Sequence, residues 1–482
     1  MVHASAIENE EYGLWVDGTE RPADDGETLT VEDPATGEAL TCVAAATEAD
    51  VATAVSVAAT AGEEWGATLP KERSRTLLAI AEAIREHAAR LAEIETLENG
   101  KPHSEARDQV RRCARHFEYY AGEADKLEGD SIPLGDGYVD YTVHEPLGVT
   151  AHIVPWNVPI YLFARSVAPA LAAGNTAVVK PAEETPIGAL TVARLAEEAG
   201  LPSGVLNVVP GDGVEAGAML TAHPDIDCVT FTGSGATGRE VAKSAVSNVN
   251  EVHLELGGKS PLLVFPDADP DRAVEETVRG IFTNAGQVCS ASSRVLVHED
   301  VHDEYVKRLA DAVEGLSVGP GIDDPDVGPL VSDEHQERVG EYLEVGRETV
   351  GEPLVGGAAF DRPGYFVEPT VFDHVDNDSR IAQEEVFGPV LTVGTFTDES
   401  EAVRLANDTR YGLVAGVMTR DVGRAHRVAR DLEAGQVYVN EWFAGGNETP
   451  FGGYKESGIG RENGRQAIHN YTQLKNVCVR LD

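Results

Sequence analysis

The chain has 482 residues, 42% of them hydrophobic, so it is long enough for two or three folded domains and too apolar for a disordered protein. Charge is its unusual property, because 82 Asp and Glu residues outnumber 38 Lys and Arg residues and leave a formal net charge of −44. A field of this sign repels nucleic acids and anionic membrane surfaces, so neither is expected as a partner.

The acidic residues are spread along the chain. Their excess over basic residues resembles the composition of proteins from halophiles that keep concentrated salt inside the cell. The five cysteines, at positions 42, 113, 228, 289 and 478, are widely spaced and include no CxxC pair. This pattern argues against a disulfide framework or a zinc site, and it predicts no metal and a reducing, cytoplasmic location. The first residues, MVHASAIENEEYG, include no apolar stretch, so no signal peptide is expected.

Helical spacing dominates residues 47–125, and a single amphipathic helix is predicted over 71–101, ending at Asn99–Gly100. Strands and helices then alternate. Short apolar strands are expected at 148–154, 176–180, 205–209 and 227–233, with helices at 162–174 and 187–200 between them. A second series follows, with strands at 260–265, 293–298, 389–396 and 435–440 and a helix at 301–316. Apolar strands separated by helices predict parallel sheets covered on both faces, in two α/β lobes.

Two segments stand apart from this alternation. Residues 130–145, DSIPLGDGYVDYTVHE, alternate in the manner of a β-strand, and so do the last residues, YTQLKNVCVRLD. The first segment is expected to form a hairpin arm that leaves the body of the protein.

The stretch FTGSGATG contains the GxGxxG spacing of Gly233, Gly235 and Gly238, between a predicted strand and a predicted helix. This spacing suits a tight turn and a pyrophosphate at a helix N-terminus. Such sites place an acidic residue roughly 20 positions further on, at the ribose. Glu255 lies at about that separation, and two alternatives stay open for it: a ribose ligand or a general base.

A thiol, a carboxylate base and a nucleotide-binding lobe together fit one type of chemistry. Cys289, in FTNAGQVCSASSR, is a candidate nucleophile for an aldehyde, and Glu255 is a candidate for activating the water that releases the acid. Asn157, between Pro155 and Pro159, is a candidate oxyanion donor. The alternatives are a buried structural cysteine, a solvated carboxylate and an ordinary Asx-turn.

Eight segments carry a resemblance to the aldehyde dehydrogenase superfamily over nearly the whole chain: VPWNVP, VVKPAEETP, FTGSGATG, LELGGKSP, GQVCSASSR, EEVFGPV, ETPFGGYKESGIGRENG and YTQLKNV. The resemblance implies that Cys289 is the nucleophile, that Glu255 is the general base for deacylation, and that Asn157 and the Cys289 backbone N–H form the oxyanion hole. It also implies a Rossmann-like cofactor domain, a second α/β catalytic domain, and a β-arm for oligomerisation.

The resemblance further implies NAD as cofactor, with NADP as an alternative. Its adenosine ribose would be held by Lys180 and Glu183, and a carboxylate there disfavours a 2′-phosphate. The remaining cofactor contacts implied are Trp156, Gly233, Ser234, Glu385 and Phe387. The implied boundaries are 1–126 and 146–257 for the cofactor domain, 258–456 for the catalytic domain, and 127–145 with 470–482 for an arm that joins a homodimer or homotetramer.

The aldehyde itself is left open. Arg165 is expected either in the substrate tunnel, where it would favour an acidic semialdehyde or a hydroxyaldehyde of sugar or amino-acid catabolism, or on a helix surface. Tyr161, Leu162, Trp442 and Phe443 are tunnel-wall candidates, with core packing as the alternative for each. Many relatives relay protons between a Lys and a Glu that matches Glu462; Ser166 stands at the Lys position here, which puts the relay in doubt. Acyl transfer to CoA and a non-catalytic structural role remain alternatives to aldehyde oxidation.

Overall fold

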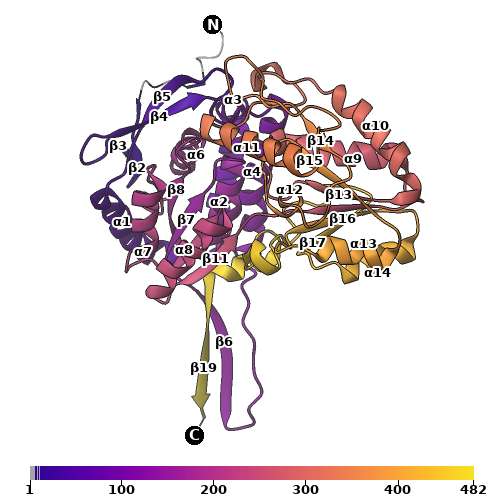
Figure 1. Cartoon of the computed structure of the whole chain (residues 1–482). Helices are drawn as coiled ribbons and strands as arrows, with labels where there is room; N and C mark the ends of the chain where they lie inside the picture. The colour runs from indigo at the N-terminus through magenta and orange to yellow at the C-terminus, as the bar shows by residue number, and fades with distance from the viewer. Residues whose placement is uncertain (1–5, 8, 10, 482) are drawn as a thin grey trace.

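The computed structural model describes residues 6, 7, 9 and 11–481, and it consists of two α/β bodies with a long arm below them (Figure 1). The first body is built on an eight-stranded sheet, whose central strands are parallel. In spatial order its strands are β18 (Gly458–Ile459), β11 (Glu251–Glu255), β10 (Cys228–Thr232), β7 (Val149–Val154), β8 (Thr176–Pro181), β9 (Leu206–Val208), β2 (Leu14–Val16) and β3 (Thr19–Arg21).

The second body contains a six-stranded sheet in which every pairing is parallel. Its strands, again in spatial order, are β14 (Thr370–Phe372), β15 (Val390–Phe396), β13 (Arg294–His298), β12 (Pro261–Val264), β16 (Val414–Met418) and β17 (Gln436–Val439). A small sheet of β1 (Glu11–Tyr12), β5 (Glu38–Ala44) and β4 (Thr28–Asp33) completes the N-terminal part.

Helices connect the strands and cover the two sheets, as parallel pairing requires. With the first body lie α1 (Glu48–Ala67), α2 (Pro70–Glu86), α3 (Ala88–Asn99), α4 (His103–Glu123), α5 (Pro159–Ala173), α6 (Ile187–Glu198), α7 (Ala218–Ala222) and α8 (Gly235–Ser247). With the second lie α9 (Pro270–Phe282), α10 (His302–Glu314), α11 (Asp333–Thr349), α12 (Arg380–Gln383), α13 (Glu399–Asn407) and α14 (Val422–Asp431). The predicted alternation into two α/β lobes is therefore confirmed.

The single helix predicted over 71–101 is wrong, because the chain breaks between α2 and α3. His87 leaves the helical region, with φ −100° and ψ 14°, and its ring Nδ1 lies 2.9 Å from the carbonyl oxygen of Ala83. The predicted end is correct. Gly100 caps α3 in the left-handed conformation, with φ 87°.

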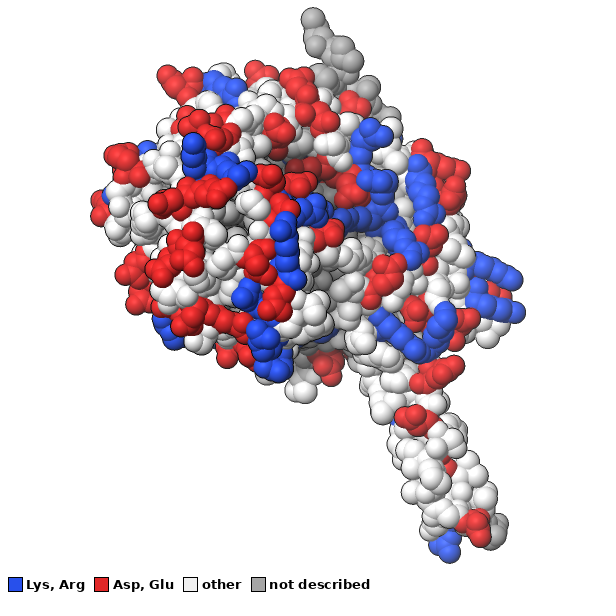
Figure 2. Space-filling view, turned by 90° about the vertical axis from the view of Figure 1, so that its right-hand side faces the viewer, with Lys and Arg blue, Asp and Glu red and all other residues white. Residues whose placement is uncertain are grey.

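The arm is a two-stranded antiparallel ribbon of β6 (Tyr138–Pro146) and β19 (Thr472–Arg480), paired over nine residues from Thr472 opposite Pro146 to Arg480 opposite Tyr138. The hairpin expected within 130–145 is short, with Ser131 bridged to Tyr141, and the main partner of β6 is the C-terminal strand. Figure 2 shows that the arm is largely uncharged, whereas acidic side chains are spread over the body beside it.

Among the described residues, no helix combines the length and the apolar character that crossing a membrane requires.

Candidate active site

Three chain segments bring the predicted reactive side chains together between the two bodies. Asn157 follows the carboxyl end of β7, Glu255 is the last residue of β11, and Cys289 lies in the loop between α9 and β13. Two cavities meet here. We call them the arginine cavity, of about 360 Å³, and the glycine cavity, of about 280 Å³. Cys289 lines both of them, so its sulfur stands at their junction.

The loop that presents Cys289 is held by an unusual backbone. Asn284, Ala285 and Gly286 all have positive φ, of 49°, 53° and 76°. A Cβ at Gly286 would approach the carbonyl oxygen of Gly388 to 2.1 Å, so only glycine fits there. Two non-glycine residues in this region cost about 1–3 kcal/mol each, which indicates that the surrounding contacts determine the loop.

Hydrogen bonds fix the cysteine loop to the segment that carries Asn157. The Nδ2 atom of Asn284 donates to the main-chain oxygen of Asn157 at 2.8 Å, and the buried Lys101 donates to the same oxygen at 2.9 Å. The side-chain Nδ2 of Asn157 donates to the main-chain oxygen of Gln287 at 2.9 Å. Because that amide has two hydrogens, one donor remains for a ligand oxygen in the glycine cavity, which Asn157 lines.

Burial dominates the electrostatics of the reactive groups. It raises the pKa of the Cys289 thiol to about 12; Glu255 and Glu385 add to the shift, and the charge of Arg165 opposes it. Burial, together with Glu462, also raises the pKa of Glu255 well above its usual range. Both carboxylate oxygens of Glu255 are buried, and neither has a hydrogen-bond partner among the described residues. Glu255 is thus a carboxylate with raised basicity and unused acceptors, which suits the general-base alternative.

The glycine cavity has the features expected of a nucleotide site. Ser234 caps α8 by accepting the N–H of Thr237 at 3.1 Å, and the first-turn N–H groups of a helix have no partner within it. Gly238 lets α8 pack against β11, since a Cβ there would meet Leu256 at 2.5 Å. Predicted residues that line this cavity are Trp156, Gly233, Ser234, Glu385 and Phe387.

A carboxylate and three aromatic rings that contact one another edge to face line the glycine cavity. Glu385 accepts the N–H of Gly258 at 2.9 Å, and burial raises its pKa to about 7. The rings of Trp156 and Phe387 meet edge to face at 5.3 Å, and Phe387 adopts a left-handed φ of 62°. His335, which sequence reasoning missed, contacts both rings and lines the cavity.

Lys180 and Glu183 do not line that cavity, but they contact each other. Their side chains pair at 2.9 Å, and the Lys180 side chain is almost completely buried. A Cβ at Gly213 would stand 3.4 Å from Glu183 and 3.9 Å from Lys180, so this glycine leaves space in front of the pair. Glu255 lines the glycine cavity together with Cys289, whereas Glu183 does not line it.

The tunnel candidates divide into those that line the arginine cavity and one that does not. Arg165, Tyr161, Leu162 and Phe443 line it. Trp442 is only 1% exposed; it does not line the cavity, and its indole donates to the main-chain oxygen of Ser290 at 3.1 Å. Its role is therefore to support the cysteine loop from the core.

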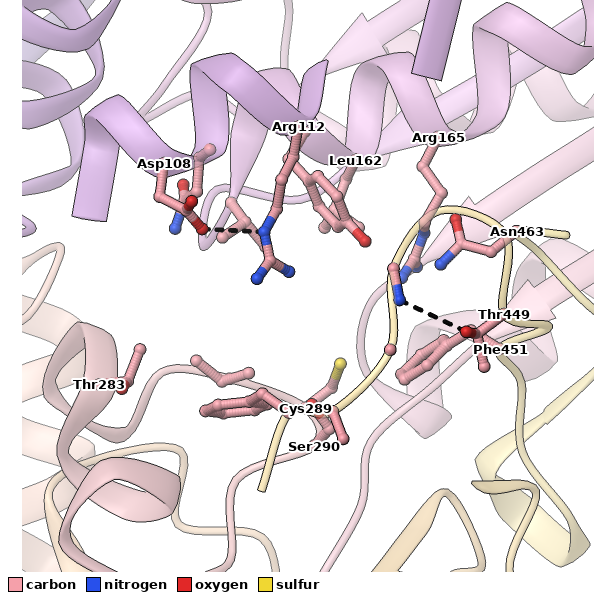
Figure 3. Close-up of a pocket in the computed structure, with 18 of the residues that line it drawn as sticks. Asp108, Arg112, Leu162, Arg165, Thr283, Cys289, Ser290, Thr449, Phe451 and Asn463 are labelled. Atoms are coloured by element: carbon pink, nitrogen blue, oxygen red, sulfur yellow. Dashed lines mark hydrogen bonds and ion pairs between the residues drawn. The ribbon is translucent and has the colours of Figure 1, made fainter. Parts of the chain in front are cut away.

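Arg165 is buried rather than on a helix surface. It forms an ion pair with Glu462, and its guanidinium lies 5.1 Å from the ring centre of Phe451 (Figure 3). The hydroxyl of Ser166 donates back to its own helix, to Leu162 and Phe163 at 3.3 Å. Ser166 therefore does not replace the missing Lys, and Glu462 has a guanidinium partner that does not release protons at physiological pH.

Sequence reasoning missed several residues of the arginine cavity. They are Arg112 and Asp108 of α4, Arg279 of α9, and Tyr438, Phe451 and Asn463 from the C-terminal part. The sequence of α4 gives little indication that Arg112 in particular lines a cavity. The helix has arginines at 107, 111, 112 and 115, and these lie on several of its faces.

Comparison with known proteins agrees with this geometry. The family model described as the aldehyde dehydrogenase family matches residues 21–477. The chain is 45% identical over 472 residues to a hydroxyisobutyraldehyde dehydrogenase from Mycolicibacterium austroafricanum, with 97% of this chain and 94% of the relative covered.

Solved structures show the same fold. The NAD+ complex of an aldehyde dehydrogenase from Bacillus cereus superposes with a TM-score of 0.98 at 41% identity, covering 100% of this chain and 99% of the other. A betaine aldehyde dehydrogenase from Staphylococcus aureus in complex with NAD+ superposes with a TM-score of 0.97 at 38% identity, covering 100% and 98%. The chain therefore belongs to the aldehyde dehydrogenase family.

Proposed function

We propose that this enzyme oxidises an aldehyde to a carboxylic acid with NAD+, with Cys289 as nucleophile, Glu255 as general base and Asn157 as oxyanion donor. The observation that carries the proposal is the position of Cys289 at the junction of two cavities, one suited to a nucleotide and one open to a second molecule. The buried, unpartnered carboxylate of Glu255 lines the glycine cavity beside it.

In the first half-reaction the thiolate of Cys289 adds to the carbonyl carbon, and the carbonyl oxygen takes up the negative charge. The free amide hydrogen of Asn157 and the main-chain N–H of Cys289 stabilise that oxyanion. NAD+, held by the residues that line the glycine cavity, would supply the acceptor for the hydride of the former carbonyl carbon, and loss of that hydride leaves Cys289 as a thioester. Glu255 then takes a proton from water, whose oxygen attacks the thioester carbon, and the C–S bond breaks to release the acid.

Residues of the glycine cavity fit this cofactor. The N-terminus of α8 suits a pyrophosphate, and Glu385 is an acceptor for ribose hydroxyls. We assign the adenosine ribose to Lys180 and Glu183, whose carboxylate would repel a 2′-phosphate and favour NAD over NADP. The cofactor domain then comprises residues 1–126 and 146–257, and the catalytic domain comprises 258–456.

We assign oligomerisation to the arm, residues 127–145 and 470–482. Two-stranded ribbons are marginally stable alone, and this arm exposes several apolar side chains: Ile132, Leu134, Tyr138, Val139, Tyr141, Leu474, Val479 and Leu481. A homodimer or homotetramer would cover them. All five cysteines are free, which supports a reducing, cytoplasmic location.

The test is NADH formation from a panel of aldehydes in concentrated KCl, with Cys289→Ala, Glu255→Gln and the matched control Cys42→Ala. Cys289→Ala should abolish activity, whereas Cys42→Ala, in β5 of the small N-terminal sheet, should leave it unchanged. Glu255→Gln should produce one NADH per site and then stall, because hydride transfer still occurs while hydrolysis of the thioester is blocked. Steady NADH formation by Cys289→Ala, or no NADH from any aldehyde with folded wild-type protein, would overturn the proposal.

A further inference from the structure

The lining of the arginine cavity is rich in basic side chains, although the chain as a whole is strongly acidic. Acidic residues outnumber basic ones by 82 to 38 overall, yet Arg112, Arg165 and Arg279 all line this one cavity. They come from α4, α5 and α9, so three separate helices direct guanidinium groups to the same space. The three groups differ in how far their charges are already balanced by the protein.

Arg165 is the buried member of the three. Its Nε pairs with Glu462, and the two side chains are only 4% and 5% exposed. Its Nη2 is buried and has no hydrogen-bond partner among the described residues. A substrate anion that displaced Glu462 would leave a buried carboxylate without its partner, which is strongly unfavourable. Arg165 therefore contributes positive potential and ring contacts to the cavity, and its unpartnered Nη2 leaves one donor besides the pair with Glu462.

Arg112 has unused hydrogen-bonding capacity. Its side chain is 42% exposed and its Nε atom lies 2.8 Å from Asp108, and among the described residues its two terminal nitrogens have no hydrogen-bond or ion-pair partner. Figure 3 shows these nitrogens pointing into the cavity from α4, across from the sulfur of Cys289 on the opposite wall. Asp108 is shared, because it also pairs with Arg111 at 2.7 Å, so it does not fully offset the charge of Arg112.

The other charged groups of the cavity leave this positive potential in place. The one ion-pair partner of Arg279 in the described part of the chain is Glu276 at 3.7 Å, and that carboxylate also binds Arg272 at 2.7 Å. Glu105 accepts the main-chain N–H of Asn284, and burial raises its pKa to about 7, so near neutral pH it carries only part of a charge.

We propose that Arg112, with Arg279 beside it, forms a carboxylate subsite, and that the substrate is an aldehyde with a carboxylate at its far end. This inference rests on the proposed function, because it places the aldehyde carbon at Cys289. The two terminal nitrogens of Arg112 form a fork that matches a planar carboxylate. The same potential disfavours a cationic aldehyde, so this cavity is unsuited to a substrate such as betaine aldehyde.

The test compares kcat/KM for 4-oxobutanoate and 5-oxopentanoate with that for butanal and pentanal, with betaine aldehyde and glyceraldehyde 3-phosphate as further probes, at one fixed KCl concentration. The wild type should prefer the carboxylated aldehydes. Arg112→Met should lower kcat/KM for them by about 10- to 100-fold, the value of a charged hydrogen bond. The loss should fall on KM, because the subsite lies away from the reacting carbon. Arg112→Lys should recover part of it.

Arg111→Met is the matched control, since it removes the same charge from the next residue of α4, which pairs with the same Asp108 but does not line the cavity. It should leave the preference unchanged. The inference is overturned if wild type oxidises neutral and carboxylated aldehydes equally well, if Arg111→Met and Arg112→Met act alike, or if the phosphorylated or cationic aldehyde is preferred. Absence of NADH with every aldehyde would instead contradict the proposed function itself.

Discussion

Arg165 of α5 and Glu462, which follows β18, form an ion pair in which neither side chain is more than 5% exposed. The pair lies beside the reactive groups. The pKa of Glu255 is raised by burial and by Glu462 and is lowered by Arg165, and the charge of Arg165 opposes the rise in the pKa of Cys289. One buried pair thus influences the proton affinity of both the nucleophile and the base.

Breaking this pair from either side should destabilise the protein. Arg165→Met leaves the carboxylate of Glu462 buried without a partner, and Glu462→Gln leaves the guanidinium alone, so each should cost about 3–5 kcal/mol of unfolding free energy. The double variant Arg165→Met/Glu462→Gln removes both charges and should recover much of the loss. Urea denaturation at fixed KCl gives the unfolding free energies of the wild type, the two single variants and the double variant. If the losses of the single variants add in the double variant, the two residues do not act as a pair.

The thiol of Cys289 should react slowly at neutral pH in the enzyme without cofactor. Because burial raises its pKa to about 12, only a small fraction is thiolate, and alkylation by iodoacetamide should accelerate about tenfold per pH unit between pH 7 and 9. Arg165→Met should slow the reaction further, since it removes the charge that lowers this pKa.

The alkylation is measured by mass spectrometry of the peptide that carries Cys289, with the exposed Cys478 as an internal reference in the same digest. A rate at Cys289 that is independent of pH between 7 and 9 would contradict a raised pKa.

Much of the site is predictable from sequence because its residues lie in segments with strong local signals. Cys289, Glu255 and Gly233 occur in glycine-rich stretches at strand or helix ends, and parallel sheets bring such ends to a common edge. In the structure Asn157 follows the end of β7, Glu255 ends β11, and Cys289 lines the same cavity as both from the loop between α9 and β13.

The sequence did not predict which side chains of an element point into a cavity and which point into the core. Trp442 and Phe443 are adjacent, yet only Phe443 lines the arginine cavity, because Trp442 is turned into the core. Arg111 and Arg112 are likewise adjacent on α4, and only Arg112 lines the cavity. The position of α4 relative to Cys289 depends on contacts between segments far apart in the sequence, and helical periodicity alone does not predict it.

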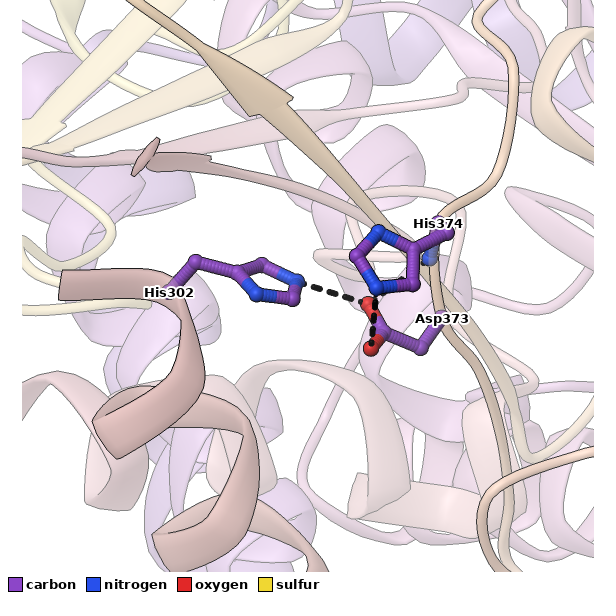
Figure 4. A group of neighbouring side chains, drawn as sticks. All are labelled: His302, Asp373 and His374. Carbon is purple, nitrogen blue, oxygen red and sulfur yellow. Dashed lines mark hydrogen bonds and ion pairs between the residues drawn. The ribbon is translucent and has the colours of Figure 1, made fainter. Parts of the chain in front are cut away.

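His302, at the start of α10, should stabilise the fold more at acid than at alkaline pH. Its Nε2 atom lies 2.9 Å from Asp373 and its Nδ1 atom 3.1 Å from Asp303, and the ring of His374 lies 4.7 Å away at a tilt of 32° (Figure 4). Burial opposes the charged ring, but the two carboxylates outweigh it and raise the pKa of His302.

Because the pKa is raised on folding, the contribution of His302 is complete below its unfolded pKa, near 6.5, and is lost as the pH rises through the folded value. The difference in unfolding free energy between wild type and His302→Asn should therefore be larger at pH 5.5 than at pH 9. His426→Asn, at an exposed position of α14, serves as the control and should show no such trend. A larger difference at pH 9 would reverse the sign and contradict the assignment.

The arm should control the size of the assembly. Leu474 of β19 is 61% exposed in the single chain, and a charge there would oppose burial against a second copy. Leu474→Asp should shift sedimentation velocity profiles toward smaller species, whereas Leu354→Asp, at a 43% exposed leucine outside the arm, should not. An unchanged assembly in Leu474→Asp would exclude this face of the arm as the interface.

Salt should stabilise this protein through its surface charge. Figure 2 shows acidic side chains over much of the visible face of the body, and the net charge of −44 makes their mutual repulsion a cost of the compact state. The Debye length falls from about 8 Å at 0.15 M to about 3 Å at 1 M salt, so KCl shortens the range of that repulsion. Relief of only ~2 kcal/mol would raise the Tm of a 150–250-residue domain by roughly 4–8 °C.

The melting temperature should therefore rise between 0.15 M and 2 M KCl. Sucrose at equal osmolality provides the control, because it favours compact states by exclusion from the surface without screening charge. If screening is the cause, KCl should raise the Tm well beyond sucrose, and most of the gain should occur below about 1 M, where the Debye length changes most. A Tm that is equal at both salt concentrations, or a sucrose effect as large as that of KCl, would show that repulsion among the 82 acidic residues does not limit the stability of this fold.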